Sequence, residues 1–315
     1  MHFLGIDTSC YTTSVAIADA DGQILLDHRQ LLSVPEGARG LRQSEMVFQH
    51  VKNLSELFPQ GYTDLKAVAA SVAPRPAEGS YMPVFRVSES YAKAAAYTAG
   101  AAFYALSHQH AHIGAAMLGA GQTFRGDYLA LHVSGGTTDL LSVQVRENVI
   151  ERIETLGSCS DITAGQFIDR IGVALGHAFP AGEAISALAA RGQAQPLRCS
   201  VRELSASFSG AESAVRRALR QGMSPEDAAA TVLSCVAGVL DTLIVRGREQ
   251  TGIDRVLLFG GVMRSEFVRR VLQARHPGLI FSEVKYASDN ACGLAAQAAF
   301  RFAWEQEERS GGNAN

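Results

Sequence analysis

Three of the nine histidines lie within the segment Ser107-His108-Gln109-His110-Ala111-His112. If the segment is helical, His108 and His112 lie four residues apart on one face and can bind one divalent cation, whereas His110 points elsewhere. A third ligand must come from a distant segment, and Asp289, which precedes an alanine-rich stretch, offers a carboxylate. The spacing predicts a metal centre of His108, His112 and Asp289, a ligand set that suits iron or zinc. The alternative is that the histidines are surface or core residues and that Asp289 only caps a helix.

The histidine pair does not carry the pattern of a zinc peptidase. Gln109 follows His108, so the H-E-x-x-H arrangement, in which a glutamate activates a zinc-bound water, is missing. Peptidase activity is therefore disfavoured.

Three turns rich in glycine or hydroxyl groups could bind phosphate: residues 8–13, Ser134-Gly135-Gly136-Thr137-Thr138, and Gly260-Gly261. Glycine lets backbone amides approach phosphate oxygens, and successive amides in such a turn form an anion-binding concavity. One Gly-Gly turn alone usually only reverses the chain. The three turns together resemble the layout by which actin-like ATPases hold a nucleotide between two lobes, so we predict a bound adenine nucleotide, either ATP or an acyl-adenylate.

Two further groups of residues could contact a ligand. Asp169 and Gly182 could bind a ribose through a carboxylate and a backbone group, although a solvated helix carboxylate is the simpler interpretation of Asp169. Arg216, Arg217 and Arg220 could contact RNA phosphates, and the alternative is an ordinary solvated helix face.

Strands, turns and helices alternate in the order of an α/β protein. Residues 3–7 and 14–18 predict a hairpin with a hydroxyl-rich tip, and the same plan recurs at residues 128–133 and 140–145. This recurrence indicates an internal duplication. We therefore predict an α/β fold of the actin-like ATPase (ASKHA) type, with two duplicated lobes and a nucleotide cleft between them. The expected lobes are residues 1–125 and 126–303, followed by a disordered tail at 304–315.

The composition of the 315 residues is that of a globular protein, with 47% hydrophobic and 19% charged residues. A net charge of −3 argues against a large basic field for nucleic acid, and no DNA partner is expected. The five cysteines are scattered without a C-x-x-C pair, so we expect neither a disulfide framework nor a thiolate zinc site. No signal peptide or membrane span is expected, and a reducing cytoplasm fits best.

The chain resembles the family of tRNA threonylcarbamoyl-adenosine synthases, once called glycoproteases, from Leu4 to about Ala299. The matching pieces, in order, are Gly5-Ile6-Asp7-Thr8-Ser9-Cys10, the His108/His112 pair, Val133-Ser134-Gly135-Gly136, Ala164-Gly165 with Asp169, Pro180-Ala181-Gly182, Ser207-Phe208-Ser209-Gly210, Gly260-Gly261-Val262 and Asp289-Asn290.

The resemblance implies an acyltransferase that moves a threonylcarbamoyl group from an adenylated donor to N6 of the adenosine at position 37 of tRNA. It implies that the two histidines and Asp289 bind one divalent metal, with iron favoured over zinc. It also implies that the nucleotide lies against the residues His132, Val133, Ser134, Gly135, Gly136, Asp169, Gly182, Gly260, Gly261 and Ser265. The implied partners are tRNA, a paralogous actin-like subunit and a small ATPase.

The chain departs from the family pattern at the first hairpin tip. Where the family usually reads S-C-D-E-T, this chain has Ser9-Cys10-Tyr11-Thr12-Thr13, so both carboxylates are lost and a general base is missing. Thr137 replaces a histidine, Ser265 replaces an asparagine, and residues 74–83 replace a G-P-G-L-rich loop. Ser9 and Tyr11 are the residues that we predict to take part in catalysis. The pattern indicates a divergent paralogue with a rebuilt acceptor side.

Three alternatives stay open. The chain could be a non-catalytic, nucleotide-binding partner subunit, which Tyr11 and Thr12 favour. It could transfer a carbamoyl group to a small molecule. It could also be a sugar or acid kinase of the same fold, with Asp7 or Asp139 as the carboxylate at the phosphate site.

Overall fold

The computed structural model describes residues 1–9, 11–35 and 40–311. The chain forms two compact units, of which the first comprises Met1–Arg125, Val145–Glu151 and Ser288–Asn315, and the second Gly126–Gln144 and Arg152–Ala287. The boundary expected after residue 125 coincides with the end of the first segment. Residues 145–151 and 288–303, which we expected in the second lobe, instead belong to the first unit. The last helix packs on the first sheet, and Gln297 on that helix bonds the backbone of Asn148 and Ile150.

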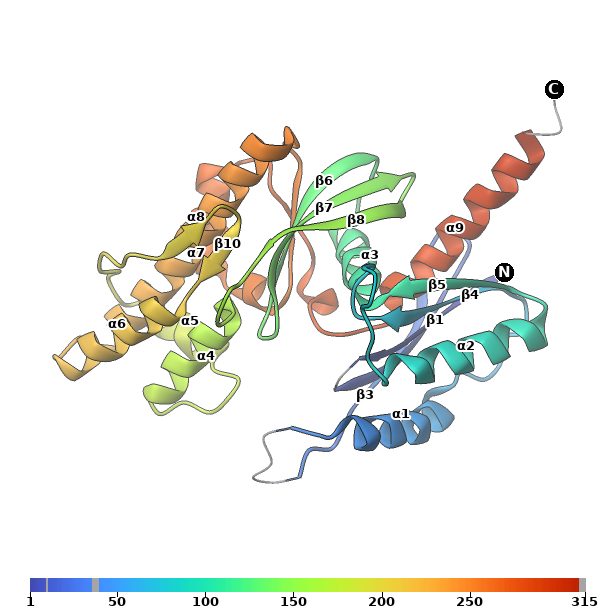
Figure 1. The fold of residues 1–315 in the computed structure, drawn as a ribbon, viewed down its shortest axis with the longest axis horizontal. Helices are drawn as coiled ribbons and strands as arrows, with labels where there is room; N and C mark the ends of the chain where they lie inside the picture. The colour runs from blue at the N-terminus through green and yellow to red at the C-terminus, as the bar shows by residue number, and fades with distance from the viewer. Residues whose placement is uncertain (10, 36–39, 312–315) are drawn as a thin grey trace. The chain divides into compact units, whose positions relative to one another are not determined.

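The first unit contains a five-stranded sheet in the order β3-β2-β1-β4-β5 (Figure 1). The strands are β1 (His2–Ser9), β2 (Thr12–Ala18), β3 (Ile24–Leu31), β4 (Leu65–Ala73) and β5 (Ala102–Ser107). β1 and β2 form the predicted hairpin, with Ser9 paired to Thr12 at its tip, and β4 and β5 run parallel to β1.

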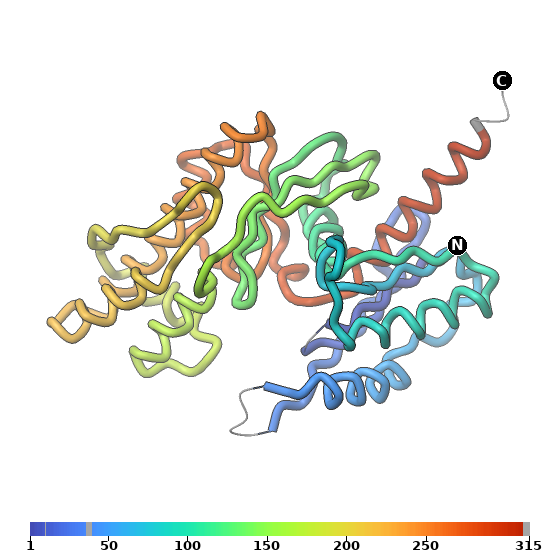
Figure 2. The backbone as a smooth tube through the Cα atoms, in the orientation of Figure 1, coloured from blue at the N-terminus to red at the C-terminus, as the bar shows by residue number. Residues whose placement is uncertain are grey.

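The two faces of this sheet are covered by different helices. Leu4 and Ile6 pack with Leu54 and Val87, which come from α1 (Gln43–Leu57) and α2 (Phe85–Ala99). Gly5 points to the opposite face because successive residues of a strand alternate, and there it meets α9 (Cys292–Gly311). α9 also packs along α3 (His108–Ala120), and the red end of the chain trace runs beside the strands of this unit (Figure 2).

The tail was expected to be disordered from residue 304. Residues 304–311 instead complete α9, and of the expected tail, residues 312–315 lie outside the described chain. Residues 294–308 contain no glycine or proline to stop a helix, so α9 continues to Gly311.

The second unit repeats the plan of the first, with a five-stranded sheet in the order β12-β11-β6-β7-β8. Read from β8, the second sheet has the same order as the first: β8-β7-β6-β11-β12 corresponds to β3-β2-β1-β4-β5. An internal duplication predicts this match. The strands are β6 (Gly126–Val133), β7 (Thr138–Arg146), β8 (Val149–Ser158), β11 (Val256–Phe259) and β12 (Ile280–Phe281). The helices are α4 (Ala164–Ala174), α5 (Gly182–Ala189), α6 (Ser209–Arg220), α7 (Pro225–Thr251) and α8 (Glu266–Arg275), with short η1 (Gly261–Arg264) and η2 (Val284–Tyr286) and the hairpin β9 (Ser200–Arg202) and β10 (Ser205–Ser207).

α7 forms the centre of the second core. It begins as predicted, with Ser224 as N-cap and Pro225 in the first turn, and it ends before Gly252, whose left-handed conformation stops the helix. Within the described chain, α7 alone is long and apolar enough to cross a membrane, but 72% of its most apolar window is buried inside the protein. Burial of this kind is typical of a core helix.

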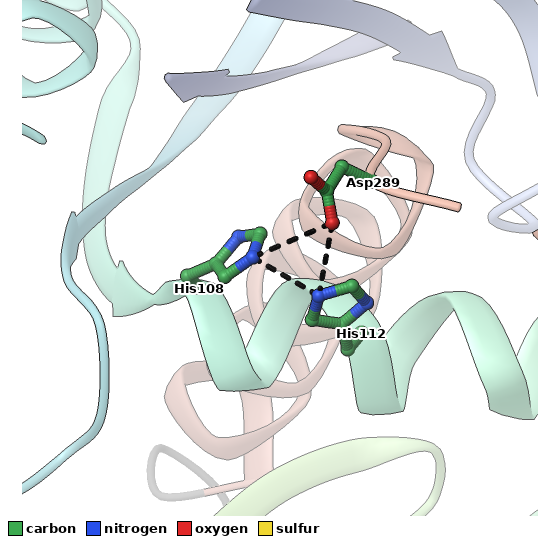
Figure 3. Close-up of side chains that lie close together, drawn as sticks. All are labelled: His108, His112 and Asp289. Atoms are coloured by element: carbon green, nitrogen blue, oxygen red, sulfur yellow. Dashed lines mark hydrogen bonds and ion pairs between the residues drawn. The ribbon is translucent and has the colours of Figure 1, made fainter. Parts of the chain in front are cut away.

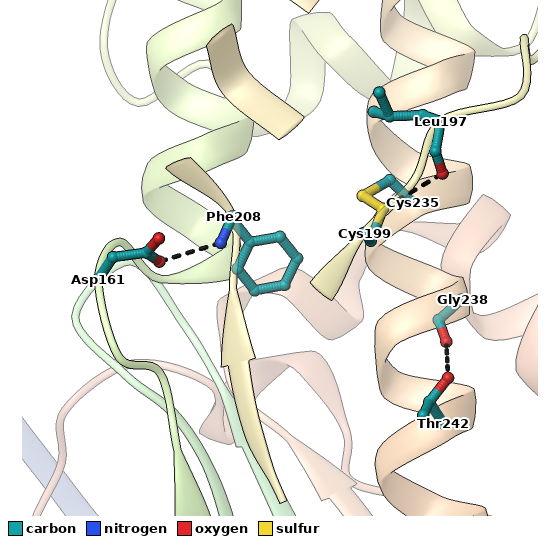
Figure 4. Close-up of a disulfide and its surroundings, with 7 residues drawn as sticks. All are labelled: Asp161, Leu197, Cys199, Phe208, Cys235, Gly238 and Thr242. Atoms are coloured by element: carbon teal, nitrogen blue, oxygen red, sulfur yellow. Dashed lines mark hydrogen bonds between the residues drawn. A yellow bond between two sulfur atoms is a disulfide. The ribbon is translucent and has the colours of Figure 1, made fainter. Parts of the chain in front are cut away.

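Two cysteines that we expected to be separate thiols are paired. Cys199 and Cys235 form a disulfide with a Cα–Cα distance of 6.2 Å, within the usual range for such bonds (Figure 4). The segment that leads into β9 lies over α7, which brings together two positions 36 residues apart. The expectation of no disulfide was therefore wrong for this pair.

Candidate metal centre and nucleotide-binding turns

His108, His112 and Asp289 converge in the first unit (Figure 3). The Nε2 atoms of the two histidines lie 3.0 Å apart, and Oδ1 of Asp289 lies 3.3 Å from Nε2 of His112 and 3.7 Å from Nε2 of His108. Two ligand atoms bound at about 2.0–2.2 Å to one ion lie about 3–3.5 Å apart at octahedral or tetrahedral angles. The nitrogen and oxygen donors therefore fit a single divalent cation.

The start of α3 fixes the two imidazoles. Ser107 is its N-cap, because the Ser107 hydroxyl accepts the backbone N–H of His110 and the His110 ring accepts the backbone N–H of Ser107. This capping box begins the helix at His108, so His108 and His112 follow one another on the same face at the predicted spacing of one turn.

Asp7, at the end of β1, orients His108. Its Oδ1 lies 3.0 Å from Nδ1 of His108, and the carboxylate is fully buried. Burial by itself lowers the pKa of His108, but the charge and hydrogen bond of Asp7, together with the charge of Asp289, raise that pKa to about 9. A carboxylate on the far nitrogen of a metal-binding histidine fixes its tautomer and leaves Nε2 for the metal. Asp7 thus belongs to the candidate centre.

Two hydroxyl groups of the first hairpin hold Asp289. The hydroxyls of Ser9 and Thr12 donate to its Oδ2 at 3.2 Å and 3.4 Å, which leaves Oδ1 directed at the histidines. Burial acts to raise the pKa of Asp289, but the hydrogen bond and charge of His112 hold it well below its usual range. Tyr11, at the hairpin tip, is 41% exposed and is not among the residues bonded to this carboxylate.

Asp289 is not the cap of α9. The Asn290 side chain accepts the backbone N–H of Cys292 at 3.0 Å, so capping falls to the neighbouring residue. Tight packing of α9 then places Asp289 near α3. A Cβ on Gly293 would lie 2.0 Å from the carbonyl oxygen of Ala111, and one on Gly5 would lie 2.4 Å from that of Ala291.

In the second unit, the turn after β6 closes through its own serine. The amides of Gly136 and Thr137 donate to the Ser134 hydroxyl at 3.3 Å and 3.1 Å, and the Ser134 amide donates to the Thr137 carbonyl. Gly135 and Gly136 are exposed. The glycines of this turn therefore face outward with their backbone accessible to an anion.

Other predicted nucleotide residues lie against this turn. A Cβ on Gly260, whose φ is +102°, would lie 2.4 Å from the carbonyl oxygen of Val133, so only glycine fits there. His132 stacks on Phe259 at 4.8 Å between ring centroids. Gly261 begins η1, and Ser265, at the start of α8, is buried with a hydroxyl that has no partner within the described chain.

α4 joins the turn to Asp169 and Gly182. At the N-terminus of α4, the Thr163 hydroxyl donates to the Gly135 carbonyl at 2.8 Å. Further along the helix, Asp169 Oδ1 accepts the Ala181 amide at 2.8 Å and so holds the turn that leads to Gly182. Burial raises the pKa of Asp169, against the lowering effect of this amide. One helix thus positions both groups of residues.

A family model described as TsaD, tRNA N6-adenosine threonylcarbamoyltransferase, matches residues 44–296. The chain belongs to this family. It is 32% identical over 333 residues to the tRNA N6-adenosine threonylcarbamoyltransferase of Corynebacterium diphtheriae, with 95% of this chain and 91% of the relative covered. The enzyme of that name from Bacillus subtilis is 28% identical, with 96% and 91% covered. The predicted family is thereby confirmed.

Solved structures confirm the predicted actin-like ATPase fold. T.kodakarensis HypF matches with a TM-score of 0.62 at 12% identity, over 97% of this chain and 48% of HypF. An activator of 2-hydroxyisocaproyl-CoA dehydratase from Clostridium difficile, solved with bound ADPNP, matches with a TM-score of 0.53 at 16% identity, over 98% of both chains. At these identities the likeness concerns the fold alone.

Sequence reasoning missed the roles of two residues in this TsaD family member. Asp7 was considered only as part of a family motif and as the acid of a kinase, and the available signal was a carboxylate at the end of the first strand. Thr12 was considered as part of a possible phosphate-binding turn and as the loss of a carboxylate, yet its hydroxyl contacts Asp289. Both contacts join segments more than 100 residues apart, which explains why local spacing did not reveal them.

Proposed function

We propose that this TsaD family member is a metal-dependent transferase that moves a threonylcarbamoyl group from an adenylated donor to N6 of the adenosine at position 37 of tRNA. Membership of the family supports the reaction class. The observation that carries the proposal is the convergence of His108, His112 and Asp289 at distances that suit one cation. Iron is the ion that we favour, with zinc as the alternative.

Bound at these three residues, the metal would polarise the carbamoyl carbonyl as a Lewis acid. The side chains of His108, His112 and Asp289 are 18%, 11% and 33% exposed, so they are largely shielded yet reachable. Asp7 holds the ring of His108, and the hairpin hydroxyls hold Asp289. The chain therefore contributes prepared ligands rather than a covalent nucleophile.

The second unit would bind the nucleotide part of the donor. The exposed turn of Gly135 and Gly136 beside Ser134, with Gly260 and Gly261, would receive the phosphate. Asp169 uses Oδ1 for the Ala181 amide, which leaves Oδ2 for a ribose hydroxyl beside Gly182. In this proposal His132, Val133 and Ser265 form the surroundings of the nucleotide.

At the hairpin tip, Ser9 and Tyr11 would have different roles. Ser9 donates to Asp289 and is therefore a positioning residue. Tyr11 is 41% exposed and would contact the substrate. With Tyr11 and Thr12 in place of two carboxylates, the tip supplies no strong base.

The test is a reconstituted assay. Protein loaded with iron or zinc is incubated with ATP, bicarbonate, threonine, the donor-making enzyme and unmodified tRNA, and the nucleosides are separated after digestion. We expect modified adenosine with the wild type and with His28→Ala, a control at an exposed histidine, and background levels with His108→Ala. Absence of the modified nucleoside with metal-loaded wild type would contradict the proposed tRNA modification.

Tyr11 and Thr12 favour a second candidate, a nucleotide-binding subunit without turnover that pairs with a paralogous actin-like subunit and a small ATPase. In that case the protein would bind metal and ATP, but no product would form unless the active paralogue were added. We propose a cytoplasmic location because tRNA is the substrate, whereas the Cys199–Cys235 disulfide is uncommon in that compartment. Rapid alkylation of thiols in cells tests this location. Free thiols at Cys199 and Cys235 would support the cytoplasm, and a retained disulfide would contradict it.

A further inference from the structure

A pocket of about 370 Å³ lies in the first unit, away from the metal-binding face of α3. His110 lines it, two residues from either candidate metal ligand, and two residues turn a helix by about 200°. The remaining wall comes from the end of β4, the loop after it, the end of β5 and α9, through Val72, Ala73, Arg75, Pro76, Ala77, Ala105, Leu106, Ser107 and Arg301.

His110 offers a hydrogen-bond donor to this pocket. The backbone N–H of Ser107 donates to Nδ1 of His110 at 3.3 Å, and the Ser107 hydroxyl lies 2.7 Å from the same nitrogen. A ring nitrogen that accepts an N–H carries a lone pair, so the proton of this imidazole is on Nε2. Within the described residues no acceptor is bonded to Nε2. His110 is only 8% exposed, so its ring is fixed in place.

Arg301 brings more donors than the protein uses. One of its amino groups donates to the Ile150 carbonyl, whereas its buried Nε has no partner within the described chain. A guanidinium has five N–H donors and keeps its charge. Burial lowers the pKa of Arg301, against the raising effect of Tyr104, Glu305 and Glu151. None of these three residues belongs to the pocket lining, which has no acidic residue among those described.

The rest of the lining is mostly apolar. Two arginines, His110 and Ser107 supply the polar groups, while the valine, leucine, alanine and proline side chains supply a surface for a short hydrocarbon. A volume of this size falls in the range of about 300–1,000 Å³ found for small-molecule sites. We propose that this pocket binds a small organic oxyanion, a carboxylate or a phosphomonoester with a short aliphatic body, with its head at Arg301 and His110.

Part of the pocket wall comes from a segment that was expected to differ from the family pattern. Arg75, Pro76 and Ala77 come from residues 74–83, the segment that departs from the family pattern. The binding proposal does not depend on the transferase reaction, because no pocket residue is a candidate metal or nucleotide ligand.

The test is calorimetric titration of the full chain with pentanoate, butyl phosphate and butylamine, which share a butyl chain and differ in the head. We expect one or both anions to bind and the amine not to bind, and the preferred anion identifies the head. Arg301→Gln should weaken anion binding about tenfold or more, because a charge-assisted hydrogen bond is lost. Arg309→Gln, an exposed position on the same helix, should leave it unchanged.

Ala77→Phe should fill the pocket while Arg301 is kept, so the proposal can be tested even if Arg301→Gln fails to fold. His108→Ala should bind the anion as the wild type does, which separates this site from the metal centre. Two results would overturn the proposal: neither anion binds the wild type, or binding survives in Ala77→Phe, which would assign it to another site such as the turn after β6.

Discussion

At the scale of single residues, the geometry of the candidate metal centre depends on side chains that hold the three candidate ligands but are not ligands themselves. Asp7 fixes one imidazole from behind, and Ser9 and Thr12 fix the carboxylate from the other side. Partners of this kind hold ligands in one orientation before the metal arrives, which raises affinity. The buried oxygens and nitrogens around β1 therefore serve the geometry of the site as well as stability.

Asp7→Asn should weaken metal binding by about 10–100-fold, because the amide removes the charge that orients His108. The measurement is a competition titration against a metallochromic chelator. Asp21→Asn, at an exposed position, is the matched control and should bind as the wild type does. An affinity for Asp7→Asn within twofold of the wild type would show that Asp7 has no orienting role.

His50 makes stability depend on pH. It is fully buried, its Nδ1 lies 2.8 Å from the Thr13 hydroxyl, and burial lowers its pKa to about 4, against the raising effect of Asp7 and the Ser9 backbone. Between pH 6.5 and 4 the unfolded chain binds this proton and the folded chain does not. The contribution of His50 is therefore complete above about pH 6.5 and falls by about 3 kcal/mol as the pH approaches 4.

Urea unfolding at several pH values checks this expectation. His50→Gln should flatten the decline of the unfolding free energy between pH 6.5 and 4, whereas His28→Gln, at an exposed histidine, should not. Identical pH profiles for the wild type and His50→Gln would contradict the assignment.

At the scale of elements, glycine contacts bring α9 onto α3 and β1. A Cβ on Gly114 would lie 2.8 Å from the carbonyl oxygen of Gly293, and a Cβ on Gly293 would lie 2.0 Å from the carbonyl oxygen of Ala111. Because both neighbours are backbone, neither can move without shifting a helix. The approach of these two helices decides where Asp289 lies.

Gly293→Ala should push α9 away from α3, lower the unfolding free energy by about 1–3 kcal/mol and weaken metal binding. Gly238→Ala, where an added Cβ meets nothing within 4 Å, is the control in the second unit. Both quantities are measured by urea unfolding and by metal titration. Unchanged metal affinity in a destabilised Gly293→Ala protein would show that the packing of α9 on α3 does not determine metal binding.

At the scale of the whole molecule, a net charge of −3 provides no general attraction for tRNA. Binding must rely on local cations. Of the three arginines on α6, Arg216 is engaged, because its Nε donates to Glu212 at 2.8 Å. Arg217 and Arg220 are exposed, without an ion-pair partner in the described parts of the chain. They are the arginines of this helix that remain for phosphates.

Replacing both Arg217 and Arg220 by Gln should weaken tRNA binding for all sequences and reduce the salt dependence, with a shallower slope of log affinity against log salt by about 1–2. Arg152→Gln, an exposed arginine paired with Glu154, is the control. Filter binding at several salt concentrations measures both effects. An unchanged slope would mean that α6 only faces solvent.

Local patterns in the sequence were sufficient for several features. The hairpin of β1 and β2, the capped start of α7 and the one-turn spacing of His108 and His112 follow from periodicity and capping, because neighbouring residues determine them. Family motifs added the fold and the reaction class, which the comparisons then supported.

Tertiary structure alone decided which distant groups meet. The carboxylate of Asp289 reaches the histidines because α9 returns to the first unit and packs through glycines, and Asp7 reaches His108 because β1 ends beside α3. The Cys199–Cys235 bond and the pocket at Arg301 arise in the same way. Contacts of this kind depend on close packing between elements far apart in the chain, and residue spacing along the sequence carries no information about that distance.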